Sequence, residues 1–557
     1  MSDATQHVSM ESLVSLCKRR GFVYPASEIY GGLNGFWDYG PLGVQLKNNI
    51  RDSWWKCTVE SPPIGPDGRP VSIVGLDSSI IQNPKTWVAS GHVGGFSDPM
   101  VDCTETKKRY RADHVLVLRH EGDSESPIYA FVQGGESDAL KKIRKRWKLP
   151  KGSISAGASI IAGGDISAAG SVVAGDSISA GNNLVAGDSI EAGGGNEPEK
   201  FKVLALTDLP EVERSRVVAP DAKNAGTLTE PREFNLMFQT QVGALATEDS
   251  KAYLRPETAQ GIFLNYKNVL DTMRVKVPFG IAQIGKSFRN EVTPRNFIFR
   301  SREFEQMEME WFCHGDETQK WYDFWKDERM KWWRSLGVGD AKLRFRDHEK
   351  DELSHYAKNG VGTVDIEYQY PFTAPDYGEL EGIAHRSNFD LSAHQEHSGQ
   401  NMKFHDESTK EKFIPHVIEP ASGLTRAVLV VLCEAYREEE VDGVGGDKRT
   451  VLKFAPHLAP TKVAVFPLVK KDGMPEKATA IYDDLRTEMT ATYDAGGAVG
   501  RRYRRQDEVG TPFCVTVDGD TLSENTVTVR DRDSMQQEKV NTSQLKAYLR
   551  DKLAAGV

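Results

Sequence analysis

Residues 285–312 (GKSFRNEVTPRNFIFRSREFEQMEMEWF) combine carboxylates and arginines in a pattern that suits a charged ligand. The segment is expected to form two strands joined by a turn, which Pro294 and Asn296 favour. Side chains alternate along a strand, so the second strand should have one polar and one apolar face. The polar face carries Gln306, Glu308 and Glu310, and the apolar face carries Met307, Met309 and Trp311.

Carboxylates on a strand that also packs into a core are costly unless water or a bound cation compensates their charge. The same segment contains four arginines: Arg289, Arg295, Arg300 and Arg302. Arginine beside carboxylate suits a ligand that carries both a phosphate and an ammonium group. An exposed hairpin with ion pairs between its strands has the same composition, and this segment alone leaves both interpretations open.

The elements that must position this hairpin follow from the spacing of apolar residues. MESLVSLCKRRG places Leu13, Leu16 and Cys17 at helical intervals, and Gly21 is expected to end that helix. A turn region rich in glycine and aromatic residues follows, and Val44 begins a longer helical pattern. Residues 231–458 mix strand-like and helix-like stretches. After the proline-punctuated stretch at 456–460, alternating strands and helices predict a separate small α/β domain.

Residues 153–194 repeat with a period of six over seven hexads, from SISAGA to SIEAGG. The second position of each hexad is aliphatic and the fourth is alanine. This period is typical of a parallel β-solenoid, in which each aliphatic side chain stacks on the equivalent one in the next coil. A flexible Gly/Ala/Ser linker is the alternative, but a linker has no reason to keep an aliphatic residue at every sixth position.

Composition excludes several classes of function. The net charge of −10 disfavours a protein that coats nucleic acid through a basic surface, although KKIRKRWK at 141–148 and RRYRR at 501–505 are candidate RNA contacts. No apolar run approaches the length of a membrane span, so no membrane partner is expected. The N-terminus lacks a secretory pattern, which favours the cytoplasm. The six cysteines form no C-x-x-C pair, so neither disulfides nor zinc are predicted.

Three segments together resemble the signature motifs of class II aminoacyl-tRNA synthetases. FRNE followed by a loop and R-x-x-x-F, within 288–304, resembles motif 2. EPASGLTR at 419–426 resembles motif 3, with Gly423 and Arg426 at the head of a helix. GFWDYGPLGVQLKNNIRDSWW resembles the glycyl version of motif 1, which is a dimer-interface helix with its lead-in. Each motif alone is a weak signal, whereas their order and spacing together are specific.

Further segments narrow the resemblance to the dimeric, α2 type of glycyl-tRNA synthetase. They are GHVGGFSDPMVDC (91–103), RADH (111–114), TEPREFNLMF (229–238), LRPETAQGIF (254–263), YGELEGIAHRSNFDL (377–391) and GRRYRRQDEVGTPFCVTVD (500–518). The resemblance covers nearly the whole chain outside 104–228. The last of these segments matches the anticodon-binding domain that this synthetase shares with the histidyl, prolyl and threonyl enzymes.

The resemblance implies an α+β fold in four parts. Residues 1–103 would form the N-terminal part of the catalytic domain with motif 1, and 229–458 would form its core with motifs 2 and 3, an antiparallel class II sheet with flanking helices. Residues 104–228 would be an insertion that carries a short parallel β-solenoid at 153–194. Residues 459–557 would form the α/β anticodon-binding domain.

The implied activity is a ligase that activates glycine with ATP and transfers the glycyl group to tRNA(Gly). The implied catalytic residues are Arg289, which would hold the α-phosphate and the glycine carboxylate, Arg426 for the γ-phosphate, and Glu291 at the adenine amino group. The implied ATP-binding residues are Arg289, Asn290, Glu291, Phe299, Arg300, Ser301, Arg302, Glu303, Phe304, Glu379, Leu380, Gly423, Leu424, Thr425 and Arg426. The implied glycine-binding residues are Arg111, Glu257, Phe304, Glu305, Gln306, Met307, Glu308, Glu419, Pro420, Ala421, Ser422 and Gly423.

A substrate without a side chain cannot be selected by filling a pocket, so it must be selected by exclusion and by charges that fix its ammonium group. The family uses three glutamates for this purpose, which correspond to Glu257, Glu308 and Glu419 here. Family members usually read E-P-S after the last glutamate. This chain reads Glu419, Pro420, Ala421 and Ser422, so the hydroxyl is displaced by one position.

Metals and partners follow from the same resemblance. Mg²⁺ is implied, with Glu379 and Glu419 as candidate ligands because oxygen atoms suit that ion. No zinc is expected, because the second cysteine that many relatives carry shortly after Cys103 is absent. A homodimer is implied by motif 1. The basic stretch in the insertion, through Lys142, Arg144 and Arg146, is expected to contact phosphates of the tRNA acceptor stem.

Three other interpretations remain at this point. The chain could be a different class II synthetase that shares the C-terminal domain, which the glycyl-style segments argue against. It could be a synthetase-like binding protein without catalysis, which the presence of Arg289 and Arg426 argues against. It could also be a scaffold built around the hexads, a role that the flanking motifs make secondary.

Overall fold

The computed structural model describes residues 9–132, 136–148, 154–157, 172–174, 184, 186, 189–192, 199–245, 247, 250–440 and 448–554. The chain forms two compact units. The first consists of Met1–His92 with Met237–Val557, and the second consists of Val93–Leu236. None of the described helices combines the length and the apolar character needed to cross a membrane.

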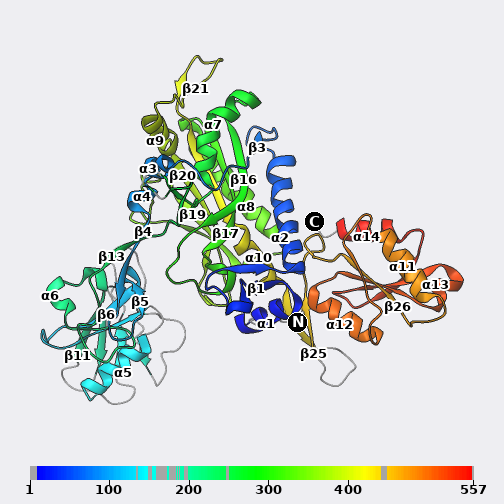
Figure 1. The fold of residues 1–557 in the computed structure, drawn as a ribbon, viewed down its shortest axis with the longest axis horizontal. Coiled ribbons are helices and arrows are strands. Elements are labelled where there is room, and N and C mark those ends of the chain that lie inside the picture. The colour runs from blue at the N-terminus through cyan, green and yellow to red at the C-terminus, as the bar shows by residue number, and fades with distance from the viewer. Residues whose placement is uncertain are drawn as a thin grey trace. The chain divides into compact units, whose positions relative to one another are not determined.

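A seven-stranded sheet forms the centre of the first unit (Figure 1). In spatial order its strands are β18 (Leu343–Asp347), β19 (Thr363–Tyr368), β20 (Gly378–Ser387), β23 (His416–Gly423), β17 (Glu303–Cys313), β16 (Phe279–Phe288) and β3 (Ile73–Gly75). All neighbours are antiparallel except β3, which runs parallel to β16. This is the antiparallel sheet that the resemblance predicts.

Helices cover both faces of this sheet. On one face, α2 (Pro41–Trp55), α8 (Thr318–Ser335) and α10 (Leu424–Ala435) share a core with Met307, Met309 and Trp311 of β17. On the other face, α7 (Ala259–Met273) and α9 (Phe389–Ser398) pack with Ile281 of β16. The predicted alternation along β17 is therefore confirmed. The polar side chains of β17 face α7 and α9, and the functional site lies on that face.

The N-terminal helix is confirmed as α1 (Met10–Arg20), with Leu13, Leu16 and Cys17 buried. The Ser9 hydroxyl accepts a hydrogen bond from the backbone of Ser12 at its start. Gly21 ends the helix at φ +78°, a left-handed conformation that glycine adopts at little cost.

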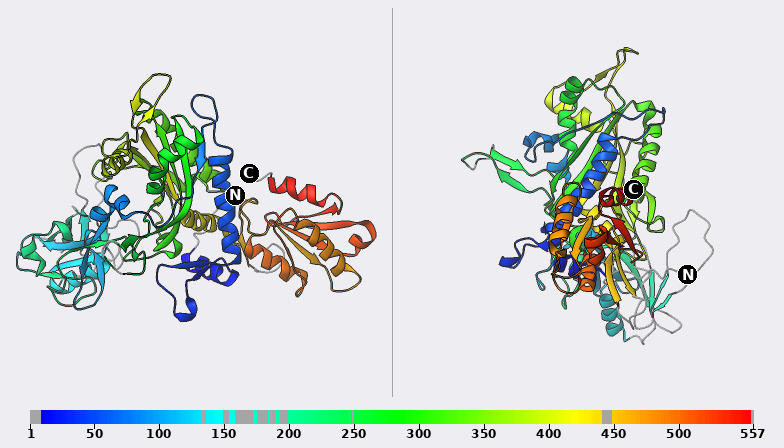
Figure 2. Two further views of the ribbon diagram at one scale, coloured as in Figure 1. Left: turned by 45° about the horizontal axis from the view of Figure 1, so that its top comes forward. Right: turned by 90° about the vertical axis from the view of Figure 1, so that its right-hand side faces the viewer.

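The C-terminal part of this unit contains the predicted α/β arrangement. Its five strands are β27 (Ala491–Tyr493), β26 (Val463–Pro467), β28 (Phe513–Val517), β29 (Thr526–Asp531) and β30 (Gln537–Asn541) in spatial order. α11 (Met474–Leu485) and α14 (Leu545–Ala554) pack on one face of the sheet, and α12 (Val499–Val509) packs on the other. Figure 2 shows this sheet between its helices from two directions.

Most of the basic run at 501–505 supports the fold of α12. Arg502 is 3% exposed and donates hydrogen bonds to the backbone carbonyls of Pro467 and Leu468 at the end of β26. Arg505 pairs with Asp494. Of the five residues in the run, only Arg501 is largely exposed, and a contact of this run with RNA stays a prediction.

The second unit contains a seven-stranded sheet in the order β12-β7-β6-β11-β10-β8-β9. The bounds are β12 (Val217–Val218), β7 (Ile128–Val132), β6 (Val115–His120), β11 (Glu199–Ala205), β10 (Ser189–Ala192), β8 (Ile154–Gly157) and β9 (Val172–Ala174). Strands β8, β9 and β10 come from the hexads and pair antiparallel with their neighbours, whereas a parallel solenoid requires parallel pairing. The rest of the hexads lies outside the described residues, and the solenoid is not confirmed.

Candidate active site

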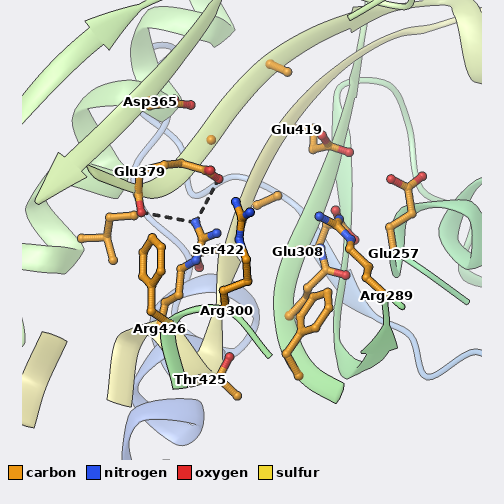
Figure 3. A pocket seen from close by; sticks show the side chains of 18 of the residues that line it. Glu257, Arg289, Arg300, Glu308, Asp365, Glu379, Glu419, Ser422, Thr425 and Arg426 are labelled. Carbon is orange, nitrogen blue, oxygen red and sulfur yellow. Dashed lines mark hydrogen bonds and ion pairs between the residues drawn. The ribbon is translucent and has the colours of Figure 1, made fainter. Parts of the chain in front are cut away.

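A cavity of about 370 Å³ opens on the α7/α9 side of the central sheet. Its volume falls within the range of sites that hold small ligands. Several segments meet there: the residue before α7 at position 257, the end of β16 with the following loop, β17, the segment 348–356, the strands β19 and β20, and the junction of β23 with α10. Figure 3 shows the charged side chains of these segments turned toward one another.

The structure brings most of the predicted residues into this one cavity. The predicted nucleotide-binding residues that line it are Arg289, Glu291, Phe299, Arg300, Ser301, Phe304, Glu379, Leu380, Gly423, Thr425 and Arg426. The predicted glycine-binding residues that line it are Glu257, Phe304, Gln306, Glu308, Glu419, Ala421, Ser422 and Gly423. All three predicted catalytic residues are among them, although 137 positions separate Arg289 from Arg426 (426 − 289).

Some predicted nucleotide-binding residues do not line the cavity. Arg302 donates hydrogen bonds to the carbonyls of Glu291 and Asn34, so it fixes the loop that carries its neighbours. Glu303 pairs with Lys286 on the facing strand. Leu424 is fully buried in the core of the sheet. Asn290 follows Arg289 in the loop and is also absent from the lining.

Four predicted glycine-binding residues also do not line the cavity. Glu305 pairs with Lys47 at 2.5 Å. Met307 is fully buried on the opposite face of β17 because side chains alternate along that strand. Pro420 is paired with Ile383 in the sheet and lines no part of the cavity. Arg111 belongs to the second unit, where its guanidinium pairs with Asp98 and Asp113.

Arg289 follows directly after β16 and lies beside the acidic part of the cavity (Figure 3). Its Nε donates a hydrogen bond of 3.0 Å to the carbonyl of Pro256. Its guanidinium lies over the ring of Phe304 at 5.3 Å, a distance at which a cation is attracted to the face of an aromatic ring. These two contacts fix the orientation of the Arg289 guanidinium in the absence of a ligand.

Arg426 occupies the first turn of α10, whose N-cap is Gly423. Its guanidinium lies 4.7 Å from the centre of the Phe299 ring and 3.1 Å from a carboxylate oxygen of Glu379. The Arg426 guanidinium is the main cause that holds the pKa of Glu379 below its usual value. Figure 3 shows this pair on the side of the cavity away from Glu257 and Glu419, with Arg300 between the two sides.

Glu257, Glu308 and Glu419 form an acidic recess at the other side of the cavity (Figure 3). The buried side chain of Arg386 pairs with carboxylates of this region. It is 2% exposed and lies 2.7 Å from Glu419 and 2.8 Å from Asp390. Arg386 is 3.9 Å from Glu257. Three carboxylates of Glu257, Asp390 and Glu419 therefore share this one guanidinium.

The pKa values in the recess diverge for physical reasons. Burial, and then the neighbouring carboxylates of Glu419 and Glu257, raise the pKa of Glu308 to about 8. Burial opposes ionisation of Glu257 as well, but His92, Arg386 and a hydrogen bond from Gln260 outweigh it and lower its pKa. The recess thus keeps one glutamate ionised and another protonated near neutral pH, an arrangement that suits an incoming cation.

Ser422 belongs to the segment that forms one wall of the cavity, but its hydroxyl faces the other side of the sheet. Ser422 pairs with Met307, which lies in the core shared with α8, and with Glu381, which binds Arg329 of α8, and direct partners on antiparallel strands share a face. Ser422 is 4% exposed, and its Oγ has no hydrogen-bond partner among the described residues. Ala421 pairs with Glu308, so the side chain of Ala421 faces the cavity.

Sequence reasoning missed several side chains of the site. Asp365 and His348 line the cavity and contact each other at 2.8 Å. Burial, and then Glu379, raise the pKa of Asp365 to about 6, against the pull of His348. Asp365 alternates with the apolar residues Val364 and Ile366 on β19, and this alternation is a signal that could have identified it. Arg386 lies within a segment noted for its resemblance, but nothing in the sequence shows which carboxylates it joins.

Two groups of oxygen atoms could hold a metal ion. Glu308, Glu310 and Glu419 each offer an oxygen within 4.8 Å of the others. Glu379 lies across the cavity and is engaged with Arg426. The two predicted Mg²⁺ ligands, Glu379 and Glu419, therefore face the same cavity from different sides.

The chain is similar to known proteins over nearly its whole length. Residues 239–435 match the family model "tRNA synthetase class II core domain (G, H, P, S and T)", and residues 462–552 match "Anticodon binding domain". It is 47% identical to the glycine–tRNA ligase of Rhodopirellula baltica, over 98% of this chain and 100% of that protein. It is 45% identical to the glycine–tRNA ligase of Caldanaerobacter subterraneus subsp. tengcongensis and 43% identical to that of Staphylococcus haemolyticus, each over 98% of this chain and 99% of the relative.

Proposed function

The chain belongs to the glycine–tRNA ligase family of class II synthetases, and from this premise we infer that it activates glycine with ATP and transfers the glycyl group to tRNA(Gly). One observation supports this function above the others. A single cavity carries arginines from two distant motifs at one side and an acidic recess at the other. ATP and the ammonium group of glycine require that combination of charges.

The activation step joins two negatively charged reactants. A carboxylate oxygen of glycine attacks the α-phosphorus of ATP, the bond to the bridging oxygen breaks, and pyrophosphate leaves. We propose that Arg289 binds both the glycine carboxylate and the α-phosphate, because it lies next to the recess. Arg300 and Arg426 would bind the outer phosphates. Fixed guanidinium groups lower the repulsion and align the reactants without covalent participation of the protein.

The adenine ring would stack on Phe304, with Glu291 at its amino group. Phe304 already contacts the guanidinium of Arg289, so one aromatic ring would couple the base to the α-phosphate. In the second step the 3′-hydroxyl of the terminal adenosine of tRNA attacks the glycyl carbonyl, and AMP leaves.

Selection of glycine would rest on charge and on exclusion. The ammonium group would lie between Glu257, Glu308 and Glu419, whose charge Arg386 balances only in part. Ala421 forms the wall that would meet a side chain. A methyl group on the α-carbon would have to displace this wall, because interiors leave few voids of that size.

Mg²⁺ would be held by Glu379 on the phosphate side and by Glu419 near the recess, and it would neutralise phosphate charge when bound. Both carboxylates line the cavity from different sides, so each would meet a different part of the substrates. Glu379 is ionised under the influence of Arg426, which leaves its oxygens ready to accept a cation.

We propose an α2 homodimer through the N-terminal segment. Ile29 and Tyr30 are 89% and 87% exposed, and Leu33 is 55% exposed, in the loop that precedes α2. Large apolar side chains gathered on a surface favour contact with another protein, and the resemblance to motif 1 supports a second copy of this chain as the partner.

Binding of tRNA would involve the C-terminal α/β domain at the anticodon and α5 (Glu136–Arg146) near the acceptor stem. The proposed domains are those expected from the sequence: 1–103 and 229–458 for catalysis, 104–228 as the insertion, and 459–557 for the anticodon. A substrate contact by Arg111, the absence of zinc and a cytoplasmic location remain predictions.

Amino-acid-dependent exchange of pyrophosphate into ATP tests the function directly. The exchange should depend on glycine and should be weak or absent with alanine and serine at equal concentration. Exchange with another amino acid, and none with glycine, would show that the chain is a different ligase. Charging of tRNA(Gly) transcripts in the same preparation tests the second step.

A further inference from the structure

Tyr356 lines the cavity, but the activity proposed above gives it no role. It belongs to residues 348–362, the segment that joins β18 to β19. Its side chain is half-buried, and its ring lies over the guanidinium of Arg386, with 4.0 Å between the guanidinium carbon and the centre of the ring. At that distance the face of an aromatic ring attracts a cation.

The ring of Tyr356 covers the buried cation of the acidic recess on the side of the cavity. Arg386 is buried and is not among the residues that line the cavity, whereas Tyr356 is. The Nε and Nη2 atoms of Arg386 donate hydrogen bonds to Asp390, and its Nη1 donates one to Glu419. A guanidinium has five N–H groups, so one that was accessible from the cavity could also bind the carboxylate or the phosphate of a substrate.

Two contacts with the end of β20 hold the backbone of this segment in place. The Ser387 hydroxyl donates a hydrogen bond of 3.1 Å to the carbonyl of Tyr356, and the backbone N–H of Val361 donates one of 2.8 Å to Nδ1 of His385. Ser387 follows Arg386 in the chain and has a φ of +53°, a left-handed conformation that is costly for a residue other than glycine. Such strain persists where the surrounding contacts require it, and it is concentrated at functional sites.

The position of the ring determines which charges the recess presents to a substrate. With Arg386 covered, the charged groups of the recess that line the cavity are the carboxyl groups of Glu257, Glu308 and Glu419. Glycine carries an ammonium group at one end and a carboxylate at the other, so an accessible guanidinium in the recess would attract the wrong end of the molecule. The ring also keeps water away from the recess, where charges attract each other more strongly than they do in water.

We propose that Tyr356 is a specificity-determining residue that shields Arg386 from the cavity, so that the recess accepts the ammonium end of glycine and rejects the carboxylate end. This inference rests on the proposed function, since it assigns the recess to glycine. The ring acts by covering a cation, so the phenolic hydroxyl is not required.

The test compares alanine and phenylalanine at position 356, with acetate as a probe that has the carboxylate of glycine but no ammonium group. In glycine-dependent pyrophosphate exchange, Tyr356→Ala should lower kcat/KM for glycine about tenfold or more, because water then weakens the attraction between the recess and an ammonium group. The same variant should bind acetate more tightly, so the Ki of acetate as a competitor of glycine should fall about tenfold or more, the effect of a gained hydrogen bond between charged groups. Tyr356→Phe keeps the ring over the cation, and both constants should stay within about threefold of the wild type.

Tyr377→Ala is the matched control. Tyr377 is also half-buried, and its ring centre lies 4.2 Å from the guanidinium carbon of Arg344, but neither of these residues lines the cavity. Its removal should change neither the kcat/KM for glycine nor the inhibition by acetate. Thermal unfolding identifies any variant that fails to fold, and Tyr356→Ser, which also uncovers the guanidinium, takes the place of Tyr356→Ala in that case.

Three results would overturn the proposal while leaving the function intact. The first is a Tyr356→Ala enzyme with the kcat/KM and the acetate inhibition of the wild type. The second is a loss of activity in Tyr356→Ala without tighter inhibition by acetate, which would show that the ring has only a structural role. The third is a Tyr356→Phe enzyme as impaired as Tyr356→Ala, which would assign the effect to the hydroxyl. Failure of the function itself is separate, because the wild type would then show no glycine-dependent exchange at all.

Discussion

Arg426→Ala is expected to lower the activation rate of this enzyme without unfolding it. Arg426 contacts Glu379 at 3.1 Å and lies 4.7 Å from the centre of the Phe299 ring. It also occupies the first turn of α10, where a positive charge opposes the helix dipole by about 0.3–1 kcal/mol. The ion pair to the half-exposed Glu379 contributes about 0–1 kcal/mol in the other direction. The two effects offset each other, so the thermal midpoint should stay nearly unchanged.

The effect on catalysis has no such offset. Removal of one preorganised donor that stabilises the transition state costs about 2.7–4 kcal/mol, or about 10²- to 10³-fold in rate. The variant also leaves the Glu379 carboxylate without the guanidinium that balances its charge, at the place proposed for the γ-phosphate. We therefore expect kcat/KM for ATP to fall by at least about 10²-fold, with a smaller change in the KM for glycine.

Glycine-dependent pyrophosphate exchange measures this, and Arg344→Ala provides a matched control. Arg344 has the same two kinds of contact, a carboxylate of Glu367 at 2.7 Å and the ring of Tyr377 at 4.2 Å, but it does not line the cavity. Its removal should leave the exchange rate unchanged. The reasoning is refuted if Arg426→Ala retains exchange within threefold of the wild type, or if its loss of rate is matched by Arg344→Ala.

Three further outcomes follow from the site and the insertion. Burial holds the pKa of Glu308 at about 8, and glycine needs the ionised form, so the KM for glycine should fall by up to tenfold per pH unit as pH rises toward about 8 and then level off. In the free enzyme, the stability contributed by protonated Glu308 is fully present below about pH 4.5 and is lost as pH rises through about 8. A KM for glycine and a melting temperature that do not change with pH would contradict the assignment. Ser422→Ala removes a buried hydroxyl without a partner on the face of the sheet away from the cavity, so the free enzyme should melt at the same or a higher temperature while the KM for glycine stays unchanged; a rise in KM would show that the hydroxyl acts on the substrate. Charge reversal of Lys145 and Arg146, both exposed on α5, should weaken tRNA binding and reduce the salt dependence of log Kd by about 1.4–1.8, whereas Lys331→Glu on α8 should do neither.

The sequence predicted those parts of the structure that depend on local periodicity. Alternation along β17 separated Glu308 from Met307, and the structure places the first in the cavity and the second in the core. Gly21 ends α1 as expected. The motif segments predicted that Arg289 and Arg426 would meet, although that prediction came from resemblance and not from spacing.

The missed residues depend on contacts between distant parts of the chain. Asp365 reaches the cavity because β19 pairs with β20, where the strand register places it opposite Gly382 and close enough to Glu379 for the two carboxyl groups to interact. In the basic runs, too, contacts with neighbouring elements decide which side chains face solvent. In α12 the helical period turns Arg502 inward to the carbonyls at the end of β26, and in α5 Lys142 donates to the carbonyl of Ala222. The sequence of a basic run does not show which side chains face solvent and which bind a buried acceptor, because that depends on the neighbouring element.

The excess of negative charge in the acidic recess is explained better by ligand binding than by the stability of the fold. Arg386 faces the carboxylates of Glu257, Asp390 and Glu419, so the buried group has a net negative charge before Glu308 ionises. An ion pair that served stability would be balanced, because unpaired buried charge is strongly destabilising. A positive charge that enters from the cavity would reduce this imbalance, and Ala421 would restrict which amine can bring it. On this proposal, charge favours the binding of an ammonium group, and the wall favours the smallest amino acid.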